Sequence, residues 1–291
     1  MSLQGVPFTN LEARAAGLSA SRIRGEDVLH SFQGVLSTED SPDLVGRCHA
    51  LAKKLPDYAF FCGPTAAKIL GVPLPLAFDA EDVVHVGVPS GHRTLVGRGI
   101  RGHTYDLVER RIHAPTGLVI TSPTRLWCEL AAILNPVDLV VAGDHLIQWR
   151  SPLCDLAALR HAAQLNPAQR GRRALRWALP RLDERSESPQ ESRLRLILID
   201  AGITGWTPNF PITTTDGYNY RADFAFPERR LILEYQSYLH EGQAKFRADM
   251  TRLSRLQADE WEGLLINADD IRNPRELAMR IRRVLARRPH F

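Results

Sequence analysis

Long apolar stretches are missing from this sequence of 291 residues. No apolar run reaches the roughly 18 residues that a membrane-spanning helix needs, so we expect no membrane segment. The opening residues, MSLQGVPFTN, have neither a basic start nor a long apolar stretch, which argues against a secretory signal. We therefore interpret the chain as a cytoplasmic protein.

Cysteine is scarce as well. The sequence has four cysteines, Cys48, Cys62, Cys128 and Cys154, which lie far apart and form no CxxC pair. Zinc sites and disulfide frameworks draw on closely patterned cysteines, so this spacing argues against both. We expect the four thiols to be reduced.

A large charge imbalance is absent too, because the formal net charge is only +4. That value is compatible with a nucleic-acid partner but does not identify one. Arginine is nevertheless concentrated in three places, residues 170–181, 247–255 and 280–288. Its planar guanidinium suits phosphate because it can bind two oxygens at once. Solvated helix faces would give the same pattern, and both interpretations stay open.

The chain is too long for one ordinary compact core, so we expect roughly two or three domains. A content of 44% hydrophobic and 24% charged residues is typical of soluble globular proteins. The expected fold class is α/β (α+β), with several domains. The predicted divisions are a winged-helix-like DNA-binding domain at 1–40, a mixed α/β domain at 41–150, a helical connector and linker at 151–187, and a C-terminal domain at 188–291.

The N-terminal segment contains signals for short helices. Thr9 is placed to cap a helix, and Glu12 three residues later can complete a capping box. Ser19 or Ser21 can open a second helix, and residues 32–36 predict a short strand. Helix, helix and strand in this order are typical of a winged-helix module.

The middle region predicts strands at 83–88 and 118–121 and helices at 123–134 and 136–148, but no catalytic constellation. Asp144 and His145 are adjacent there. Neighbouring residues on a helix do not face each other, so we expect a capping or surface role for this pair.

The C-terminal domain has the strongest element signals. Ser188 predicts a helix cap, with Pro189 at the first helical position and Glu191 at the third. The predicted order is α-β-β-β-α-β-α, with elements at 189–201, 206–213, 218–226, 231–236, 242–258, 261–267 and from 274 onward.

The hairpin joining the second and third of these strands sets their register. If residues 227–230 form the turn, Phe226 lies opposite Leu231 and Asp223 lies opposite Glu234. Strand alternation then separates two faces. The apolar face has Phe224, Phe226, Leu231, Leu233 and Tyr235, and the polar face has Asp223, Glu234 and Gln236.

Two carboxylates directly opposite would have Cβ atoms about 4.5–5.5 Å apart, and such a pair is destabilising. A divalent cation between Asp223 and Glu234 removes that penalty, and oxygen ligands suit Mg²⁺ or Mn²⁺. Two other readings stay open: a solvent-facing pair with screened repulsion, or a turn displaced by one residue. Glu191 is either a third acid of this site or only the capping partner of Ser188.

These residues lie in a run that resembles a known family. Asp223, Glu234-Tyr235-Gln236, His240 and Phe246-Arg247-Ala248-Asp249 resemble the DUF559 family, relatives of the very-short-patch-repair endonucleases in the PD-(D/E)XK superfamily. The resemblance covers about residues 189–288. Where the family commonly reads Glu-Tyr-Asp-Gly, this chain has Gln236 and Ser237, and the superfamily's usual lysine is absent.

The resemblance implies a restriction-endonuclease-like fold and hydrolysis of a nucleic-acid phosphodiester, with DNA as the partner. Asp223 and Glu234 would hold Mg²⁺ or Mn²⁺, with Gln236 and Glu191 beside them. His240 would be a general base or acid, or would only fix its loop. Expected nucleic-acid contacts are Arg247, Arg252, Arg193 and Arg221, joined in the N-terminal domain by Arg22 and Arg24.

A second resemblance covers the N-terminal part. Phe8-Thr9, Gly17-Leu18-Ser19, Ser122-Pro123-Thr124-Arg125 and Gly143-Asp144-His145-Leu146 are similar to AbiEi-type antitoxin-like proteins of actinobacteria. It implies a winged-helix domain that reads DNA, with residues 19–24 near its recognition helix. A homodimer or a toxin partner stays open. The sequence thus supports two hypotheses, a metal-dependent DNA endonuclease or nickase, and a regulator whose nuclease-like domain is silent.

Overall fold

The computed structural model describes residues 8–23, 25, 29–32, 35–37, 43–106, 111–166, 169–236 and 243–291. It is a mixed α/β protein that divides into two compact units. Unit 1 comprises Met1–Ala142 and Leu153–Leu179, and unit 2 comprises Gly143–Pro152 and Pro180–Phe291. The fourfold division expected from the sequence stays a prediction. Within the described ranges, no helix is both long and apolar enough to cross a membrane.

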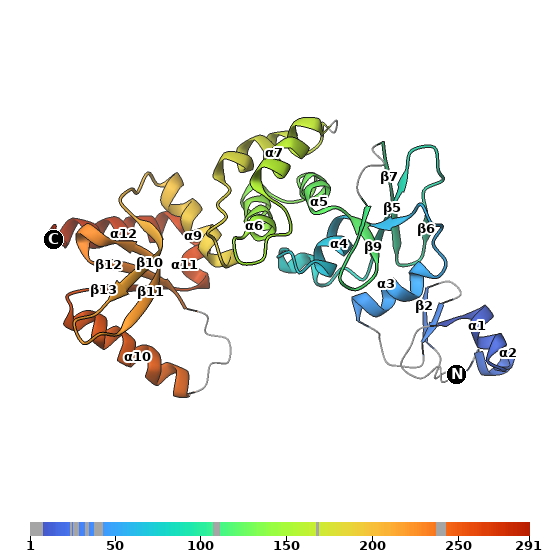
Figure 1. Cartoon of the computed structure of the whole chain (residues 1–291), viewed down its shortest axis with the longest axis horizontal. Coiled ribbons are helices and arrows are strands. Elements are labelled where there is room, and N and C mark those ends of the chain that lie inside the picture. The colour runs from blue at the N-terminus through green and yellow to red at the C-terminus, as the bar shows by residue number, and fades with distance from the viewer. Residues whose placement is uncertain are drawn as a thin grey trace. The chain divides into compact units, whose positions relative to one another are not determined.

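The first elements of unit 1 form a small three-stranded sheet (Figure 1). They are β1 (Phe8–Thr9), α1 (Asn10–Ala15), α2 (Ala20–Ile23), β2 (Leu29–Phe32) and β3 (Val35–Ser37), with strand order β1-β3-β2. The predicted capping box is confirmed, since Thr9 and Glu12 bond each other's backbone N–H. The single strand predicted at 32–36 is wrong. Phe32 pairs with Val35, so the chain reverses between them.

A larger mixed sheet follows in unit 1, with strand order β6-β7-β5-β4-β9-β8. Its strands and helices are α3 (Leu44–Ala52), β4 (Phe60–Phe61), α4 (Gly63–Ile69), β5 (Val84–Pro89), β6 (Val96–Gly97), β7 (Ile100–Tyr105), β8 (Arg111–His113), β9 (Val119–Thr121) and α5 (Pro123–Leu130). The helices α6 (Pro136–Ile147), α7 (Leu156–Leu165) and α8 (Arg172–Ala178) come next. The strands expected at 83–88 and 118–121 are confirmed as β5 and β9.

Unit 2 has a four-stranded sheet in the order β10-β11-β12-β13, antiparallel except between β12 and β13. Its elements are α9 (Pro189–Asp200), β10 (Thr207–Thr213), β11 (Asn219–Phe226), β12 (Leu231–Tyr235), α10 (Gln243–Ala258), β13 (Glu262–Ile266), α11 (Ala268–Arg272) and α12 (Pro274–Arg287). The predicted order is confirmed, apart from the short extra helix α11. Asn267 starts α11 by accepting bonds from two backbone N–H groups.

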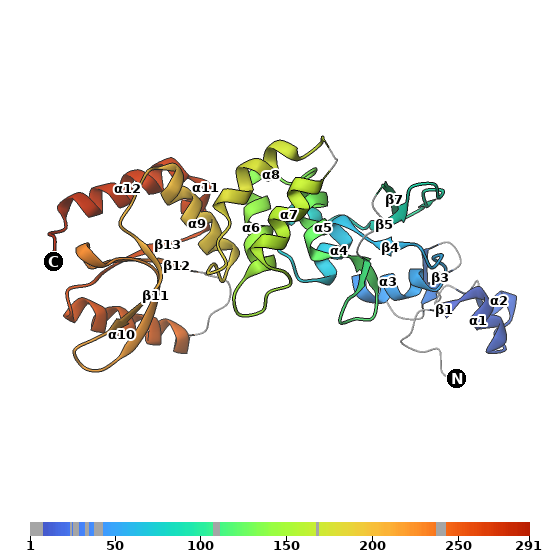
Figure 2. The ribbon, with the colours of Figure 1, turned by 45° about the horizontal axis from the view of Figure 1, so that its top comes forward.

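Helices cover both faces of this sheet, with α9 and α12 on one side and α10 on the other (Figures 1 and 2). The predicted apolar face is confirmed, because Phe224, Phe226, Leu231 and Leu233 belong to the core that includes helix residues such as Leu277. The opposite face also has a core, which includes Ala225 and Ile232 from the strands and Leu256 from α10. Any polar group on that second face is therefore partly enclosed by α10.

Candidate functional site

The hairpin of β11 and β12 has the register that its turn predicts. Phe226 pairs with Leu231 and Phe224 with Leu233. A 3-10 turn at Pro227–Arg229 joins the strands, and Arg230 follows it with a φ of 44°. The regular ladder ends at Phe224 and Leu233, which brings Asp223 opposite Glu234 on the next rung.

Side chains replace the backbone ladder at that rung. The Asp223 N–H donates to Glu234 Oε1 at 3.3 Å, and the Tyr235 N–H donates to Asp223 Oδ2 at 3.0 Å. Each carboxylate is thus held against the backbone of the other strand. The two acids meet at one place, as the sequence predicted, and neither is free to swing into solvent.

Strand β11 is irregular at Asp223. Ala222 and Ala225 both belong to the core beneath α10, although strict alternation would place residues three apart on opposite faces. Asn209, opposite Asp223 on β10, has a φ of 51°, which is unusual for a residue other than glycine. Such distortions re-aim side chains, and they often lie beside functional sites.

Burial and mutual repulsion dominate the electrostatics of the pair. Glu234 is only 6% exposed, and desolvation together with the charge of Asp223 raises the pKa of Glu234 to about 7. Desolvation also raises the pKa of Asp223, although the Tyr235 N–H opposes that shift. The folded protein therefore resists holding both charges at neutral pH.

Two further side chains, Arg252 and Tyr220, contact Glu234 at this site. Arg252 of α10 lies 3.5 Å from Glu234 Oε2 and stacks over the ring of Tyr220 at 4.9 Å. The Tyr220 hydroxyl hydrogen-bonds Glu234, and burial raises the pKa of Tyr220. Arg252 was predicted to contact phosphate, and Tyr220 was missed because an aromatic in a strand is usually core.

Glu191 lies near the pair and also acts at the start of α9. The Ser188 hydroxyl accepts from the Glu191 N–H, as predicted. The carboxylate of Glu191 accepts from the Glu187 N–H at 3.1 Å, one residue before the expected capping partner. Burial raises the pKa of Glu191, and the charge of Asp223 adds to that rise. Glu191 therefore combines features of both roles that the sequence left open.

The other predicted contact residues are dispersed. Arg221 pairs with both carboxylate oxygens of Glu187 at 2.6 Å, and Arg193 donates to the Pro189 carbonyl at 3.4 Å. Arg247 is exposed on α10. The backbone N–H of Gln236 donates to the Ile266 carbonyl, just past the end of β12.

In the N-terminal part, Arg22 is exposed on α2. The predicted residues His240 and Arg24 lie outside the described residues.

The donor chemistry of the pair fits a divalent cation. Asp223 and Glu234 offer hard carboxylate oxygens, and a dication would favour the charged forms that burial now disfavours. Over the described ranges, no group of three or more His, Cys, Asp or Glu side chains could hold a metal ion together. The remaining ligands of a bound Mg²⁺ would then come from water or substrate, as is common for this ion.

The expectation of a surface or capping role for Asp144 is wrong. Asp144 is 1% exposed and belongs to unit 2, where its Oδ2 accepts from Arg195 at 2.6 Å and from Ser192 at 2.7 Å. The Asp183 N–H donates to its other oxygen. Sequence spacing could not reveal this network, because Arg195 lies 51 residues away.

Unit 1 also has a buried polar cluster that the sequence did not indicate. Glu129 accepts from the Gly63 N–H at 2.9 Å and from the Thr121 hydroxyl at 3.0 Å, and burial raises its pKa to about 7. Nearby, His85 and His103 share a hydrogen bond of 3.0 Å. The carboxylate of Glu129 is thus held by a backbone N–H and a hydroxyl, which is a structural arrangement.

Comparisons with known proteins give relatives but no activity. No family model matches the chain. The uncharacterized Mycobacterium tuberculosis proteins MT2308 and Rv2248 are each 32% identical to it over 269 residues, which is 91% of this chain and 95% of theirs. The crystal structure of the Rv2827c protein from Mycobacterium tuberculosis covers 66% of this chain and 75% of its own, with 16% identity and a TM-score of 0.41. That score is too low to assign a common fold.

Proposed function

This chain belongs to the same family as the Mycobacterium tuberculosis proteins MT2308 and Rv2248, and we propose that its unit 2 is a metal-dependent nuclease that hydrolyses a phosphodiester of DNA. One observation carries the proposal. Asp223 and Glu234 meet on facing rungs of β11 and β12, enclosed by α10, with both pKa values raised. Two acids on facing rungs repel each other, and buried groups with shifted pKa values are concentrated at functional sites, which supports a functional role for the pair.

In the proposed enzyme, Asp223 and Glu234 hold Mg²⁺ or Mn²⁺. The bound ion would stabilise charge developing on the phosphate and lower the pKa of a coordinated water. Hydrogen bonds within the protein orient the two carboxylates. The Tyr235 N–H orients Asp223, the Asp223 N–H orients Glu234, and Tyr220 adds a third hydrogen bond. Arg252 is placed to attract the phosphate as well as Glu234.

The fold assignments expected from the resemblance are part of the proposal. The order α9-β10-β11-β12-α10-β13-α12, with acids on the second and third strands, supports a restriction-endonuclease-like unit. The order α1-α2-β2-β3 supports a winged-helix-like module for DNA, and the preceding strand β1 completes its small sheet. A cytoplasmic location accords with a DNA substrate.

A second candidate function is a DNA-binding regulator whose nuclease-like unit is silent. The hydrogen bonds that orient the acids also satisfy them, and Arg252 already supplies a positive charge to Glu234. Gln236 stands where the resembling family has an acid, and that family's usual lysine is absent. A closed network of this kind can persist without any metal.

Cleavage of supercoiled plasmid separates the two candidates. The wild type is incubated with plasmid and either Mg²⁺ or Mn²⁺, beside Asp223→Asn and Glu234→Gln. We expect nicked or linear product from the wild type and a rate lower by at least roughly a hundredfold in both variants, because each loses a charged ligand.

Glu228→Gln is the matched control, since Glu228 is an exposed acid on the turn of the same hairpin. It should cleave like the wild type. Equal cleavage by all four proteins would refute the site, and cleavage by none of them would favour the silent regulator.

A further inference from the structure

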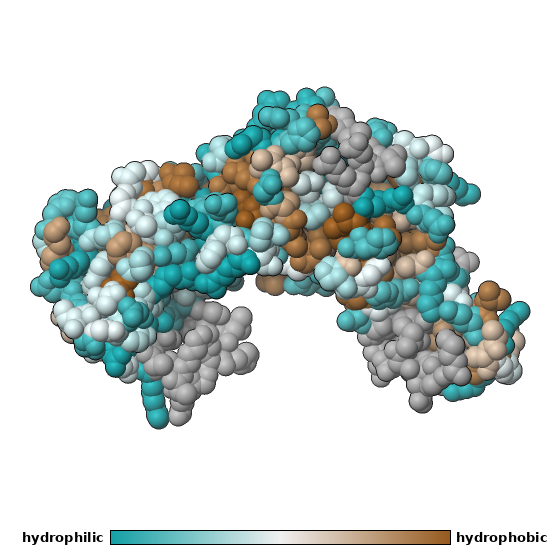
Figure 3. Space-filling model, viewed as in Figure 1, coloured by the Kyte–Doolittle hydropathy of each residue, from teal (hydrophilic) through white to brown (hydrophobic). Residues whose placement is uncertain are grey.

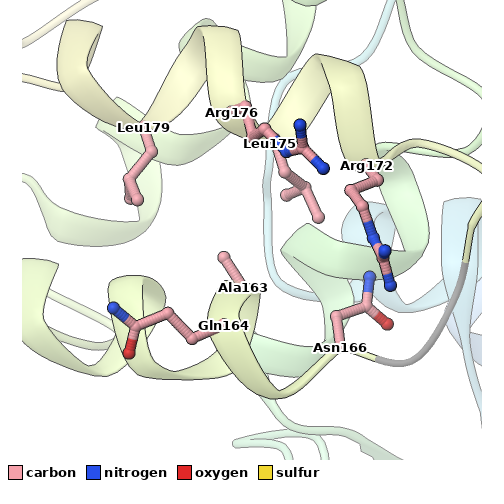
Figure 4. A pocket seen from close by; sticks show the side chains of 7 residues that line it. All are labelled: Ala163, Gln164, Asn166, Arg172, Leu175, Arg176 and Leu179. Carbon is pink, nitrogen blue, oxygen red and sulfur yellow. The ribbon is translucent and has the colours of Figure 1, made fainter.

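Unit 1 has a cavity of about 380 Å³ between α7 and α8 (Figure 4). Ala163, Gln164 and Asn166 line it from the side of α7, and Arg172, Leu175 and Arg176 line it from the side of α8. In Figure 4, Arg172 extends toward Asn166 at one end, and Gln164 lies at the other. The cavity thus combines two guanidinium groups, two carboxamides and an apolar wall.

The helices that form this cavity have a large positive charge. Residues 156–179 contain five arginines and neither Asp nor Glu, a formal charge of +5. The whole chain has a net charge of +4, so everything outside this segment sums to −1. In Figure 3, hydrophilic residues dominate the outer edge over α7. Residues 277–288 have the same formal charge of +5, but Arg280, Arg287 and Arg288 of that segment pair with acids. The segment of α7 and α8 is therefore one of two strongly basic segments of the chain.

These arginines also differ from several arginines of unit 2 in how they are paired. Within the part of the chain that the structure describes, none of Arg160, Arg170, Arg172, Arg173 and Arg176 lies within 4.0 Å of a carboxylate. Arginines of unit 2 such as Arg221, Arg230 and Arg255 each have an acidic partner. Unneutralised cations close together repel one another, so an external anion would stabilise them.

We infer that the cavity and the arginines around it bind the phosphates of a nucleic-acid strand. Arg172 and Arg176 would bind one phosphate inside the cavity, where Gln164 can donate a hydrogen bond. Arg160, Arg170 and Arg173 are exposed on or beside the same helices, outside the cavity lining, and can contact further phosphates. A small phosphorylated molecule would need only the two inner arginines, so the wider row favours a polymer.

The inference rests on the proposed function only in its ligand class, and it does not require hydrolysis. Binding is therefore measured in EDTA with full-length protein on the Asp223→Asn background, using a fluorescein-labelled DNA duplex and fluorescence anisotropy over a range of salt concentrations. Arg172→Gln/Arg176→Gln should weaken binding by about tenfold near physiological salt. It should also reduce the slope of log K against log salt by roughly 0.9, because the two arginines share one phosphate contact and each lost contact removes about 0.9.

Arg93→Gln/Arg98→Gln is the matched control, because it removes the same charge from two exposed arginines elsewhere in unit 1. We expect the control to keep nearly the full salt slope. Equal losses in both double variants would overturn the inference, since general charge alone would then explain binding. An unchanged slope in Arg172→Gln/Arg176→Gln would overturn it as well.

Two further measurements complete the test. Gln164→Glu, which places a carboxylate at the cavity without removing an arginine, should also weaken binding, and thermal melting checks that each variant is folded. Isothermal titration with inorganic phosphate and with ATP tests for a small ligand. Binding of either that depends on Arg172 and Arg176, with DNA affinity unchanged, would overturn a nucleic-acid ligand. Plasmid cleavage remains a separate assay, so failure of this inference and failure of the proposed nuclease are distinguishable.

Discussion

Asp223 and Glu234 show how one residue's charge depends on its neighbour. Glu234 is buried beside another acid, and both effects favour its protonated form. Its hydrogen bonds with the Asp223 N–H and Tyr220, together with Arg252, oppose them without cancelling them. The result is a carboxyl group whose pKa of about 7 lies within the physiological range. Such a group is suited to binding a cation and is costly when no cation is bound.

The raised pKa of Glu234 predicts how stability changes with pH. The folded state holds this proton more tightly than the unfolded state, in which the pKa is near 4.5. The contribution of Glu234 is therefore fully present below about pH 4.5 and is lost as pH rises to about 7. Glu234→Gln should raise the free energy of unfolding at pH 8 by roughly 1–3 kcal/mol relative to its effect at pH 4, in metal-free urea titrations.

Glu228→Gln again provides the control. Because Glu228 is an exposed acid, this substitution should change the free energy of unfolding by the same amount at both pH values. A Glu234→Gln effect that is equal at the two pH values would show that Glu234 is not held protonated. The expected increase in the free energy of unfolding at pH 8 is smaller than the pKa shift alone would give. The reason is that the neutral amide introduced by Glu234→Gln would bind Arg252 less strongly than the carboxylate of Glu234 does.

At the scale of elements, the start of α8 depends on a glycine. Gly171 caps this helix with a φ of 85°, a conformation that strongly favours glycine. A Cβ at this position would lie 2.6 Å from the Ala131 carbonyl carbon, at the end of α5. Close approach of backbone to backbone therefore positions α8, and with it the arginines of the cavity.

Gly171→Ala should destabilise unit 1 for two reasons, a strained φ and a clash with rigid backbone. Gly117→Ala has a similar φ of 81° in the same unit but meets no atom within 4 Å, so it isolates the strain. We expect a loss of about 1–2 kcal/mol for Gly117→Ala and about 1–3 kcal/mol more for Gly171→Ala, measured by thermal melting and urea unfolding. Equal losses would mean that Ala131 can move aside.

At the scale of the whole molecule, the chain passes between the two compact units three times. Residues 143–152 belong to unit 2, although residues 153–179 return to unit 1. Asp144, from the shorter segment, accepts from the buried Arg195 of α9. Unit 2 is therefore incomplete without a piece of chain that precedes α7 and α8.

A fragment of residues 180–291 tests this dependence. It lacks Asp144, which leaves Arg195 buried without its closest carboxylate, and the loss of one partner of a buried pair costs about 3–5 kcal/mol. We expect the fragment to unfold at lower urea concentration than unit 2 does in the full chain. Arg195→Leu should stabilise the fragment but destabilise the full chain, where it would leave the carboxylate of Asp144 buried without its arginine partner. Destabilisation of both by Arg195→Leu would show that Asp144 is not the reason.

The sequence by itself determined the elements of unit 2 and the register of its central hairpin. Helix caps, turn residues and the alternation of apolar side chains act over a few residues, so their effect can be worked out without knowing what packs against them. The position of Asp223 opposite Glu234 follows from the same local rules. The prediction of one strand at residues 32–36 was wrong, because Phe32 and Val35 belong to two antiparallel strands and the sequence between them was not interpreted as a turn.

The tertiary structure decided which distant groups surround those acids. Arg252 reaches Glu234 because α10 packs across the sheet, and Asp144 meets Arg195 because a separate segment joins unit 2. Arg172 and Arg176 of α8 line a cavity together with Gln164 of α7 only because the two helices pack side by side. Contacts of this kind depend on how whole elements pack, and sequence spacing carries no record of packing between segments that are far apart in the chain.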